Sequence, residues 1–209
     1  EEEAAAAAEE GGEDGEAAAP KNGPGQTLHP ATGWLFNGHF GGGVGAIAAS
    51  PTEPTFASGG ADGTLRLYSS ESHACTKVQQ LSTAAPITCA AYAPDGSNIA
   101  VGVGGGVDVL DPSNLADRVA RLPVDDDDAA IAKRSPVKMI RYSGDGGVVM
   151  VLDEAKVVTL YTAGSWSPKQ SFDLSKATPA AVNGLDLSDD GAWLQVGTDN
   201  MELLYYSVE

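Results

Sequence analysis

A pattern of roughly 25 residues returns four times in this chain of 209 residues. The repeats begin at Val44, Ile87, Val137 and Val182, so successive starts lie 43, 50 and 45 residues apart. Each repeat contains three short apolar runs separated by turn residues. A period of about 40–45 residues that carries three or four short strands predicts the blade of a β-propeller. The expected fold class is therefore all-β, with about four blades. Repeat scaffolds of this kind are usually binding surfaces and rarely catalysts.

The apolar runs predict individual strands within each blade. The expected blades span 44–81, 87–122, 137–174 and 182–209. The first strands are expected at 44–49, 87–92, 137–142 and 182–187, the second at 55–58, 98–102, 148–152 and 193–197, and the third at 63–68, 107–110, 157–161 and 202–206. Outer fourth strands are expected at 76–81, near 119–122 and near 169–174. Residues 27–36 resemble the outer strand of a preceding blade. We therefore expect the chain to be the C-terminal part of a larger or tandem propeller.

The first 25 residues differ in composition from the rest of the chain. They consist largely of Glu, Ala, Gly and Pro, and the first twenty hold seven Glu and one Asp without Lys or Arg. Such a segment cannot bury enough apolar surface to offset its ordering entropy. Residues 1–25 are therefore predicted to be a disordered acidic linker or tail, and residues 26–209 to form the propeller.

Net charge restricts the partners that the chain can have. The formal net charge is −17, of which the first twenty residues supply −8. This balance argues against binding to nucleic-acid phosphates or to anionic lipid. No run of the sequence approaches the ~18 apolar residues of a membrane helix. The two cysteines, Cys75 and Cys89, are too few for a disulfide framework and are read as reduced structural thiols in a cytosolic protein.

One histidine has neighbours that suggest a structural role. His39 follows Gly38 directly before the first blade. We expect it to lie under the sheet and to form a buried polar network with Ser58, Asp62 and Tyr68. This set offers complementary donors and acceptors, as a buried network requires. A structural network is preferred over a catalytic base or a metal ligand.

The sequence contains no pattern typical of an enzyme. The glycines at 102 and 104–106 lack the Lys-Ser/Thr of a phosphate-binding loop, and a hairpin explains them. Asp125–Asp128 could chelate a cation weakly, but they lack the spacing of a calcium loop and are read as a solvated loop. His29 and His73 have no ligand partners at zinc spacing. We therefore expect no enzymatic activity, no cofactor and no metal.

Four basic residues gather after the acidic run. Lys133, Arg134, Lys138 and Arg141 form the densest basic stretch of an acidic chain. They are candidates for contact with an acidic partner.

Three segments of the chain resemble one family of WD-repeat proteins. The first segment runs from the Gly38-His39 pair to Tyr68. The second, Met139–Tyr161, reads MIRYSGDGGVVMVLDEAKVVTLY. The third is the end of the chain, which reads DNMELLYYSVE. These segments are similar to the last repeats of the echinoderm microtubule-associated protein-like family. In that family a repeat with M-R-Y-S-x-D-G precedes a final repeat ending E-I-L-Y-W-D. Here one extra residue stands between Met139 and Arg141, and Tyr206-Ser207 replaces the terminal Trp-Asp.

The resemblance covers about residues 27–209 and implies a partner. It implies a tandem pair of fused propellers that binds tubulin, the microtubule lattice or axonemal proteins, in the cytoplasm, on the cytoskeleton or in the cilium. The alternative is a generic WD-repeat scaffold for assembly of a signalling or ubiquitin-ligase complex. The family's basic, coiled-coil targeting segment does not occur in this sequence, and the second to fourth repeats lack the Gly-His pair. Their sheets are therefore expected to depend more on apolar packing.

Overall fold

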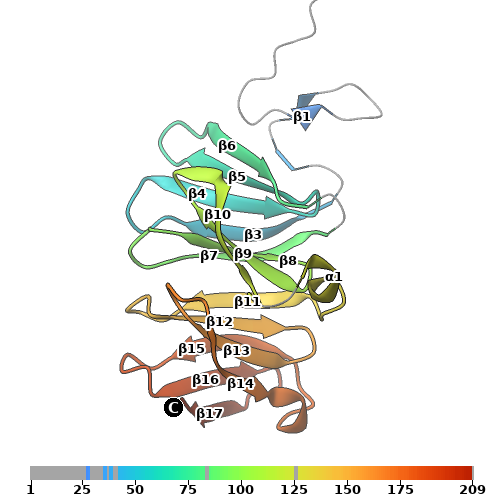
Figure 1. Cartoon of the computed structure of the whole chain (residues 1–209), viewed down its shortest axis with the longest axis vertical. Helices are drawn as coiled ribbons and strands as arrows, with labels where there is room; N and C mark the ends of the chain where they lie inside the picture. The colour runs from blue at the N-terminus through green and yellow to red at the C-terminus, as the bar shows by residue number, and fades with distance from the viewer. Residues whose placement is uncertain are drawn as a thin grey trace, which may run out of the picture.

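The fold was determined as a computed structural model, which describes residues 27–28, 35–36, 38–39, 42–82, 85–124 and 127–208. The predicted acidic segment at 1–25 and His29 lie outside these residues. Four antiparallel sheets follow one another along the long axis of the molecule (Figure 1). Each is a simple up-and-down meander, which confirms the prediction of propeller blades.

The first three described blades have four strands and the last has three. Blade one contains β3 (Val44–Ala49), β4 (Thr55–Gly60), β5 (Thr64–Ser69) and β6 (Cys75–Gln80). Blade two contains β7 (Ile87–Tyr92), β8 (Ile99–Val103), β9 (Gly106–Asp111) and β10 (Asn114–Leu122). Blade three contains β11 (Val137–Tyr142), β12 (Val148–Asp153), β13 (Val157–Thr162) and β14 (Pro168–Asp173). Blade four contains β15 (Val182–Leu187), β16 (Trp193–Thr198) and β17 (Leu203–Ser207).

The predicted first strand of every blade coincides with the observed one. The second and third strands agree to within two residues at each end. The outer strand of blade two is longer than predicted, because pairing with β9 continues back to Asn114 through two irregularities of register.

The segment before blade one differs from the prediction of a single outer strand. Two short strands, β1 (Thr27–Leu28) and β2 (Leu35–Phe36), pair with each other in antiparallel register. Within the described residues they form a two-stranded sheet that is separate from the four blades.

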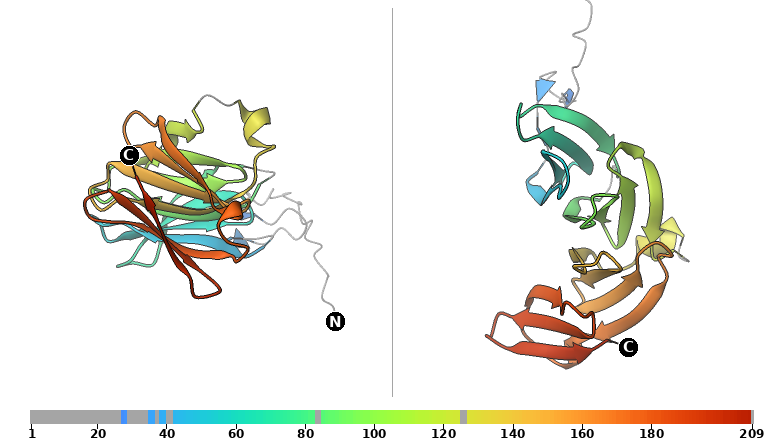
Figure 2. Two further views of the ribbon diagram at one scale, coloured as in Figure 1. Left: turned by 90° about the horizontal axis from the view of Figure 1, so that it is seen from below. Right: turned by 90° about the vertical axis from the view of Figure 1, so that its left-hand side faces the viewer.

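The blades are arranged along an arc that is open on one side (Figure 2). The first strands β3, β7 and β11 lie next to one another and form the inner edge of this part of the arc. Three apolar clusters fill the spaces between consecutive blades. Ile87 and Leu65 belong to the first cluster, Val109 and Val149 to the second, and Leu160 and Leu194 to the third. Each of these side chains is at most 1% exposed.

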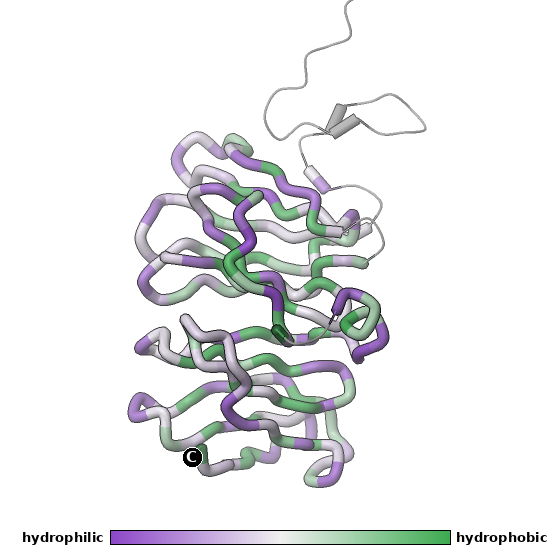
Figure 3. The backbone as a smooth tube through the Cα atoms, viewed as in Figure 1, coloured by the Kyte–Doolittle hydropathy of each residue, from purple (hydrophilic) through white to green (hydrophobic). Residues whose placement is uncertain are grey.

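The alternation of the strands explains this layered core. Successive side chains of a strand point to opposite faces, so one strand can pack against both neighbouring blades. In β12, for example, Val149 and Val151 face blade two, whereas Met150 and Leu152 face blade four. Apolar segments run along the strands and polar ones gather at the turns (Figure 3).

The connection between blades two and three contains a short helix where the sequence predicts a solvated loop. Helix α1 (Asp128–Ile131) begins after Asp127, whose carboxylate accepts a hydrogen bond of 2.7 Å from the amide of Ala130. Aspartate is a favoured N-cap residue, and a further acid in the first turn suits the helix dipole. Ile131, 1% exposed, anchors the helix against the fold. A 3₁₀ turn at Leu174–Lys176 follows blade three.

Candidate partner-binding surface

His39 lies at the centre of a compact polar cluster at one edge of blade one. Its Nδ1 atom is 2.9 Å from a carboxylate oxygen of Asp62 and 3.0 Å from the hydroxyl of Thr64, and its Nε2 atom is 2.9 Å from the hydroxyl of Ser58. The side chains of His39 and Asp62 are 4% and 3% exposed. Because the carboxylate can only accept, Nδ1–H donates to Asp62, and Nε2 forms a hydrogen bond with the Ser58 hydroxyl. This arrangement uses both ring nitrogens for structure.

Two features of the sequence make this cluster possible. Gly60 has no side chain, and a Cβ atom there would lie 2.3 Å from Nδ1 of His39. Thr64, which the sequence analysis did not include, donates its hydroxyl to Asp62 at 2.7 Å and its amide at 3.1 Å. An Asp followed two residues later by Thr is the pattern of such a turn, and it could have revealed this partner.

Tyr68, the fourth residue of the predicted network, lies beside Phe56. Its ring stacks on Phe56, with centroids 5.2 Å apart and an interplanar angle of 13°. Burial raises the pKa of the Tyr68 hydroxyl. Hydrogen bonds join the imidazole to Asp62, Ser58 and Thr64, so Thr64 is added to the residues that the sequence analysis named.

The other blades replace this polar cluster with apolar packing. The residues that correspond to Ser58 in the repeat are Val101, Val151 and Val196. They are 0%, 9% and 0% exposed. Blades two to four therefore bury aliphatic side chains where blade one buries hydrogen bonds.

The four predicted basic residues do not form one patch. Lys133 is exposed beside helix α1. Lys138 donates a hydrogen bond of 2.8 Å to the main-chain oxygen of Val182 and so links blades three and four. Arg134 and Arg141 line two different hollows that share no residue.

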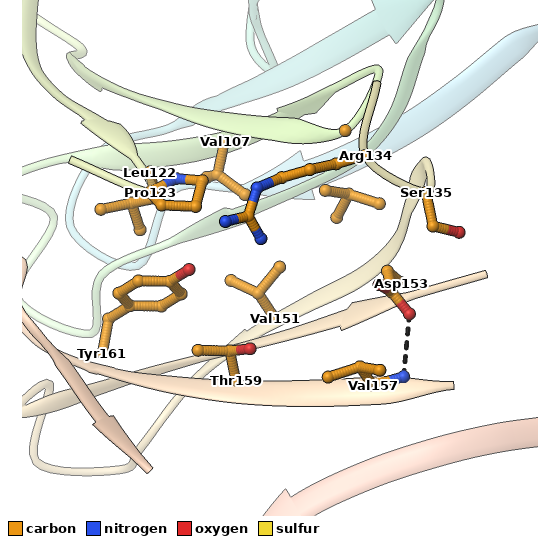
Figure 4. A pocket seen from close by; sticks show the side chains of 12 residues that line it. Val107, Leu122, Pro123, Arg134, Ser135, Val151, Asp153, Val157, Thr159 and Tyr161 are labelled. Atoms are coloured by element: carbon orange, nitrogen blue, oxygen red, sulfur yellow. Dashed lines mark hydrogen bonds between the residues drawn. The ribbon is translucent and has the colours of Figure 1, made fainter. Parts of the chain in front are cut away.

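The hollow at Arg134 lies between blades two and three. It has a volume of about 110 Å³, and its apolar walls include Val107, Leu122 and Val151. The guanidinium of Arg134 points into it, and the hydroxyl of Tyr161 lies across from it (Figure 4). Asp153 at its edge accepts a hydrogen bond of 2.8 Å from the amide of Val157. The hollow therefore combines apolar walls with polar groups at its rim.

Arg141 lies at the opposite end of β11 from Arg134 and lines a groove of about 470 Å³. Ile47, Ala91 and Pro94 contribute to the same groove. It follows the ends of the first strands of blades one to three.

A second set of contacts, which the sequence analysis missed, joins the first strands of adjacent blades. Each first strand has a β-bulge at its second residue. In blade two that residue is Thr88, whose hydroxyl donates a hydrogen bond of 2.6 Å to the main-chain oxygen of Val137 in blade three. In blade three it is Lys138, with the bond to Val182 described above. A bulge re-aims a side chain, and here it directs each one at the neighbouring strand. Alignment of the four repeats would have placed these residues at one position.

The described residues contain no group of three or more His, Cys, Asp or Glu side chains that could hold a metal ion. In the same part of the chain, no helix has the length and apolarity needed to span a bilayer.

Comparison with known proteins agrees with the blades and with the cluster at His39. Residues 31–69, which include His39, Ser58, Asp62 and Thr64, match the family "WD domain, G-beta repeat". A stretch of 163 residues is 27% identical to human "Echinoderm microtubule-associated protein-like 3". The match covers 78% of this chain but only 17% of that relative. The chain is thus built of β-propeller blades, matches the WD repeat over residues 31–69, and is similar over most of its length to this human echinoderm microtubule-associated protein-like protein.

Proposed function

We propose that this protein is a non-enzymatic, microtubule-associated structural protein that contacts tubulin, the microtubule lattice or axonemal proteins through its propeller blades. The observation that carries the proposal is the similarity to the human relative, whose name describes it as microtubule-associated protein-like. That similarity extends over 163 residues, which is longer than any single repeat. The proposed location is the cytoplasm and its cytoskeleton, including the cilium.

The charge of the chain limits how such contact can arise. The 189 residues after the first twenty still carry a net charge of −9. Bulk attraction to an acidic lattice is therefore not the driving force. Contact must use shape and local basic groups, and Lys133, Arg134 and Arg141 are exposed cationic residues of the predicted set. Lys138 serves the packing of the blades through its hydrogen bond to Val182.

Co-sedimentation with microtubules tests the proposal. The full chain is incubated with taxane-stabilised microtubules over a range of salt concentrations, beside a variant in which Lys133, Arg134 and Arg141 are changed to Ser. A matched control changes Lys169 and Lys176, two exposed lysines on and after β14, to Ser. We expect the wild type and the control to sediment, the triple variant to sediment less, and salt to weaken binding only shallowly, because few charge pairs form.

The outcomes separate the function from the contact residues. Equal sedimentation of the wild type and the triple variant would remove these residues from the interface. If no form sediments with microtubules or binds tubulin dimers, the second candidate takes over, a WD-repeat scaffold that assembles other protein complexes. The match of residues 31–69 to a general repeat family favours that second candidate.

A further inference from the structure

A hollow of about 440 Å³ lies between blades two and three, at the end of the blades that carries the turns from first to second strands. Its walls come from these two blades alone. They include Asp95 and Asp145 in the corresponding turns of the two blades. Val119 of β10 and Trp166, in the turn between β13 and β14, also line the hollow. The lining residues include no Lys or Arg. We call this space the Trp166 hollow.

Trp166 brings a hydrogen-bond donor without a partner to this hollow. The residue is 7% exposed and packs in the apolar cluster between blades two and three. Its indole N–H forms no hydrogen bond with another described residue, although a buried tryptophan usually pairs this group. The indole nitrogen is not sealed from solvent, and Trp166 borders the hollow. A ligand in the hollow can therefore supply the missing acceptor.

The two aspartates give the hollow a negative charge. Both side chains are exposed. A hydrogen bond of 3.0 Å from the amide of Ser97 lowers the pKa of Asp95. Hydrogen bonds from the Ser143 hydroxyl and the Gly147 amide lower the pKa of Asp145. Both carboxylates therefore stay ionised at neutral pH. With the indole donor and the apolar side chain from β10, they fit a ligand that combines a cation, an aliphatic stem and a hydrogen-bond acceptor.

The corresponding hollow between blades one and two has a volume of about 450 Å³. It is lined by the corresponding turns and outer strand, and its acidic residues are Glu53 and Asp111. Here the chain supplies its own lysine. The ammonium group of Lys77 in β6 donates hydrogen bonds of 2.7 and 2.6 Å to the main-chain oxygens of Pro112 and Ser113 in blade two. A lysine side chain thus occupies this type of site within the protein.

The outer strand of blade two supplies no such lysine to the Trp166 hollow. Lys77 of β6 pairs with Leu67 of β5. The residue at the matching place in β10 is Ala120, which pairs with Val109 of β9. Val119, the residue of β10 that lines the hollow, is 53% exposed. Two carboxylates and an open donor therefore remain where the neighbouring hollow holds an ammonium group.

We propose that the Trp166 hollow binds a lysine side chain from a basic segment of a partner protein. The aliphatic stem packs on Val119 and the indole, and the ammonium group bonds to Asp95 and Asp145. A main-chain oxygen of the partner accepts from the indole N–H. Lysine stems pack along apolar surface while their charged heads keep polar contacts, and an ammonium group near an indole ring gains further attraction. The lining residues include none of the basic residues proposed for microtubule contact, so the lysine contact is independent of that function.

Nuclear magnetic resonance of the isotope-labelled full chain tests the contact at the indole itself. The probe is the peptide acetyl-Ala-Ala-Lys-Ala-Ala-amide. Its control carries Nε-acetyllysine, which keeps the stem but removes the charge. The Trp166 indole signal is assigned by its loss in Trp166→Phe. We expect this signal to shift saturably with the lysine peptide and to stay in place with the control peptide. A signal that stays in place with both peptides, or moves equally with both, would overturn the proposal.

Two pairs of substitutions test the position of the ammonium group. Asp95→Asn with Asp145→Asn keeps the acceptor oxygens of both turns and should weaken peptide affinity about fivefold, the combined effect of two exposed ion pairs. Glu154→Gln with Asp189→Asn removes two exposed acids that do not line the hollow, and it should leave the affinity unchanged. Equal weakening by both pairs would show only bulk attraction to an acidic chain, which contradicts binding in the hollow.

Filling the hollow from within is the complementary experiment. Val119→Lys places a lysine on the outer strand, as Lys77 is placed at the neighbouring hollow, and it should abolish binding of the peptide. The matched control Val124→Lys adds the same charge at a residue that is 54% exposed and does not line the hollow. It should bind like the wild type, and circular dichroism shows whether each variant is folded. If both lysine variants bind the peptide equally, the ammonium group does not lie in the hollow and the proposal fails.

Discussion

The hydroxyl of Thr88 donates a hydrogen bond of 2.6 Å to the main-chain oxygen of Val137, and this bond joins the first strands of blades two and three. The two residues are 49 positions apart in the sequence. The bond sits at a β-bulge of β7, where the side chain turns toward the neighbouring blade. Thr88→Val keeps the shape of the side chain but removes the donor. We expect a loss of about 1–3 kcal/mol in the free energy of unfolding, because the carbonyl of Val137 loses its partner.

Urea unfolding followed by circular dichroism measures this loss. The control is Thr162→Val, at an exposed threonine at the end of β13. Equal stability of the Thr88 variant and the wild type would show that the bond contributes nothing to blade packing.

Gly45→Ala should also destabilise the contact between adjacent blades. A Cβ atom at Gly45 would lie 2.3 Å from the main-chain oxygen of Ile87, a distance that requires the backbones of blades one and two to separate. Overpacking of this kind typically costs about 1–3 kcal/mol. Gly184→Ala is the matched control, because a Cβ atom there meets nothing within 4 Å. Thermal unfolding should rank the Gly45 variant well below the control, and similar midpoints for the two would contradict the close approach.

The polar cluster of blade one should matter for stability. His39→Ala or Asp62→Ala leaves buried donors and acceptors unpaired, so we expect each variant to lose about 1–3 kcal/mol in the free energy of unfolding. Asp189→Ala, at an exposed aspartate in a turn of blade four, serves as the control. Denaturant unfolding of the three variants and the wild type measures these free energies. If neither cluster variant differs from the control, His39 does not stabilise the blade.

The chain should lose stability in acid through its turn aspartates. Hydrogen bonds from the Ser143 hydroxyl and the Gly147 amide lower the pKa of Asp145, and those from Ser188 and Ala192 lower the pKa of Asp190. A carboxyl whose folded pKa lies below its unfolded value, about 3.9, stabilises the fold above that value and loses this effect as pH falls through the folded pKa.

Unfolding curves at successively lower pH test this expectation. The double variant Asp145→Asn, Asp190→Asn cannot titrate at these turns, so its stability should fall less steeply below about pH 4 than that of the wild type. Asp189→Asn controls for the loss of charge. If the stability of the double variant and that of the wild type fall equally steeply with pH, these two turns do not cause the loss of stability in acid.

Both cysteines should be unreactive in the folded protein. Burial raises the pKa of Cys89 to about 11 and also raises the pKa of Cys75. The thiolate is the reactive form, so a thiol-specific disulfide reagent at pH 8 should modify neither residue rapidly until the chain unfolds. Unfolded thiols deprotonate near pH 8.5, whereas the folded ones deprotonate only at higher pH, so these groups lower stability as pH rises above about 8.5. Rapid modification of one equivalent of thiol in native protein would contradict the burial of that cysteine.

Much of the fold could be predicted because the evidence for it is local. Alternating apolar residues and turn residues specify each strand within a few positions, and the repeat period sets the number of blades. Ser58 and Asp62 were also predictable, since they occupy fixed places on the β4–β5 hairpin, and His39 was predictable because it stands in a Gly-His pair directly before the blade. The division at residue 26 and the basic contact residues remain predictions.

The sequence by itself determined the strands, the turns, the repeat and the resemblance to WD repeats, because these depend on residues close together in the chain. Only the tertiary structure decided which side chains meet between blades. It stacked Tyr68 on Phe56, gave Thr64 a place beside His39, and directed Lys138 to the oxygen of Val182. The physical reason is that these contacts depend on how the backbone segments pack together in space. An aromatic, hydroxyl or lysine side chain at these positions can either make such a contact or point into solvent, so its residue type alone does not specify its partner.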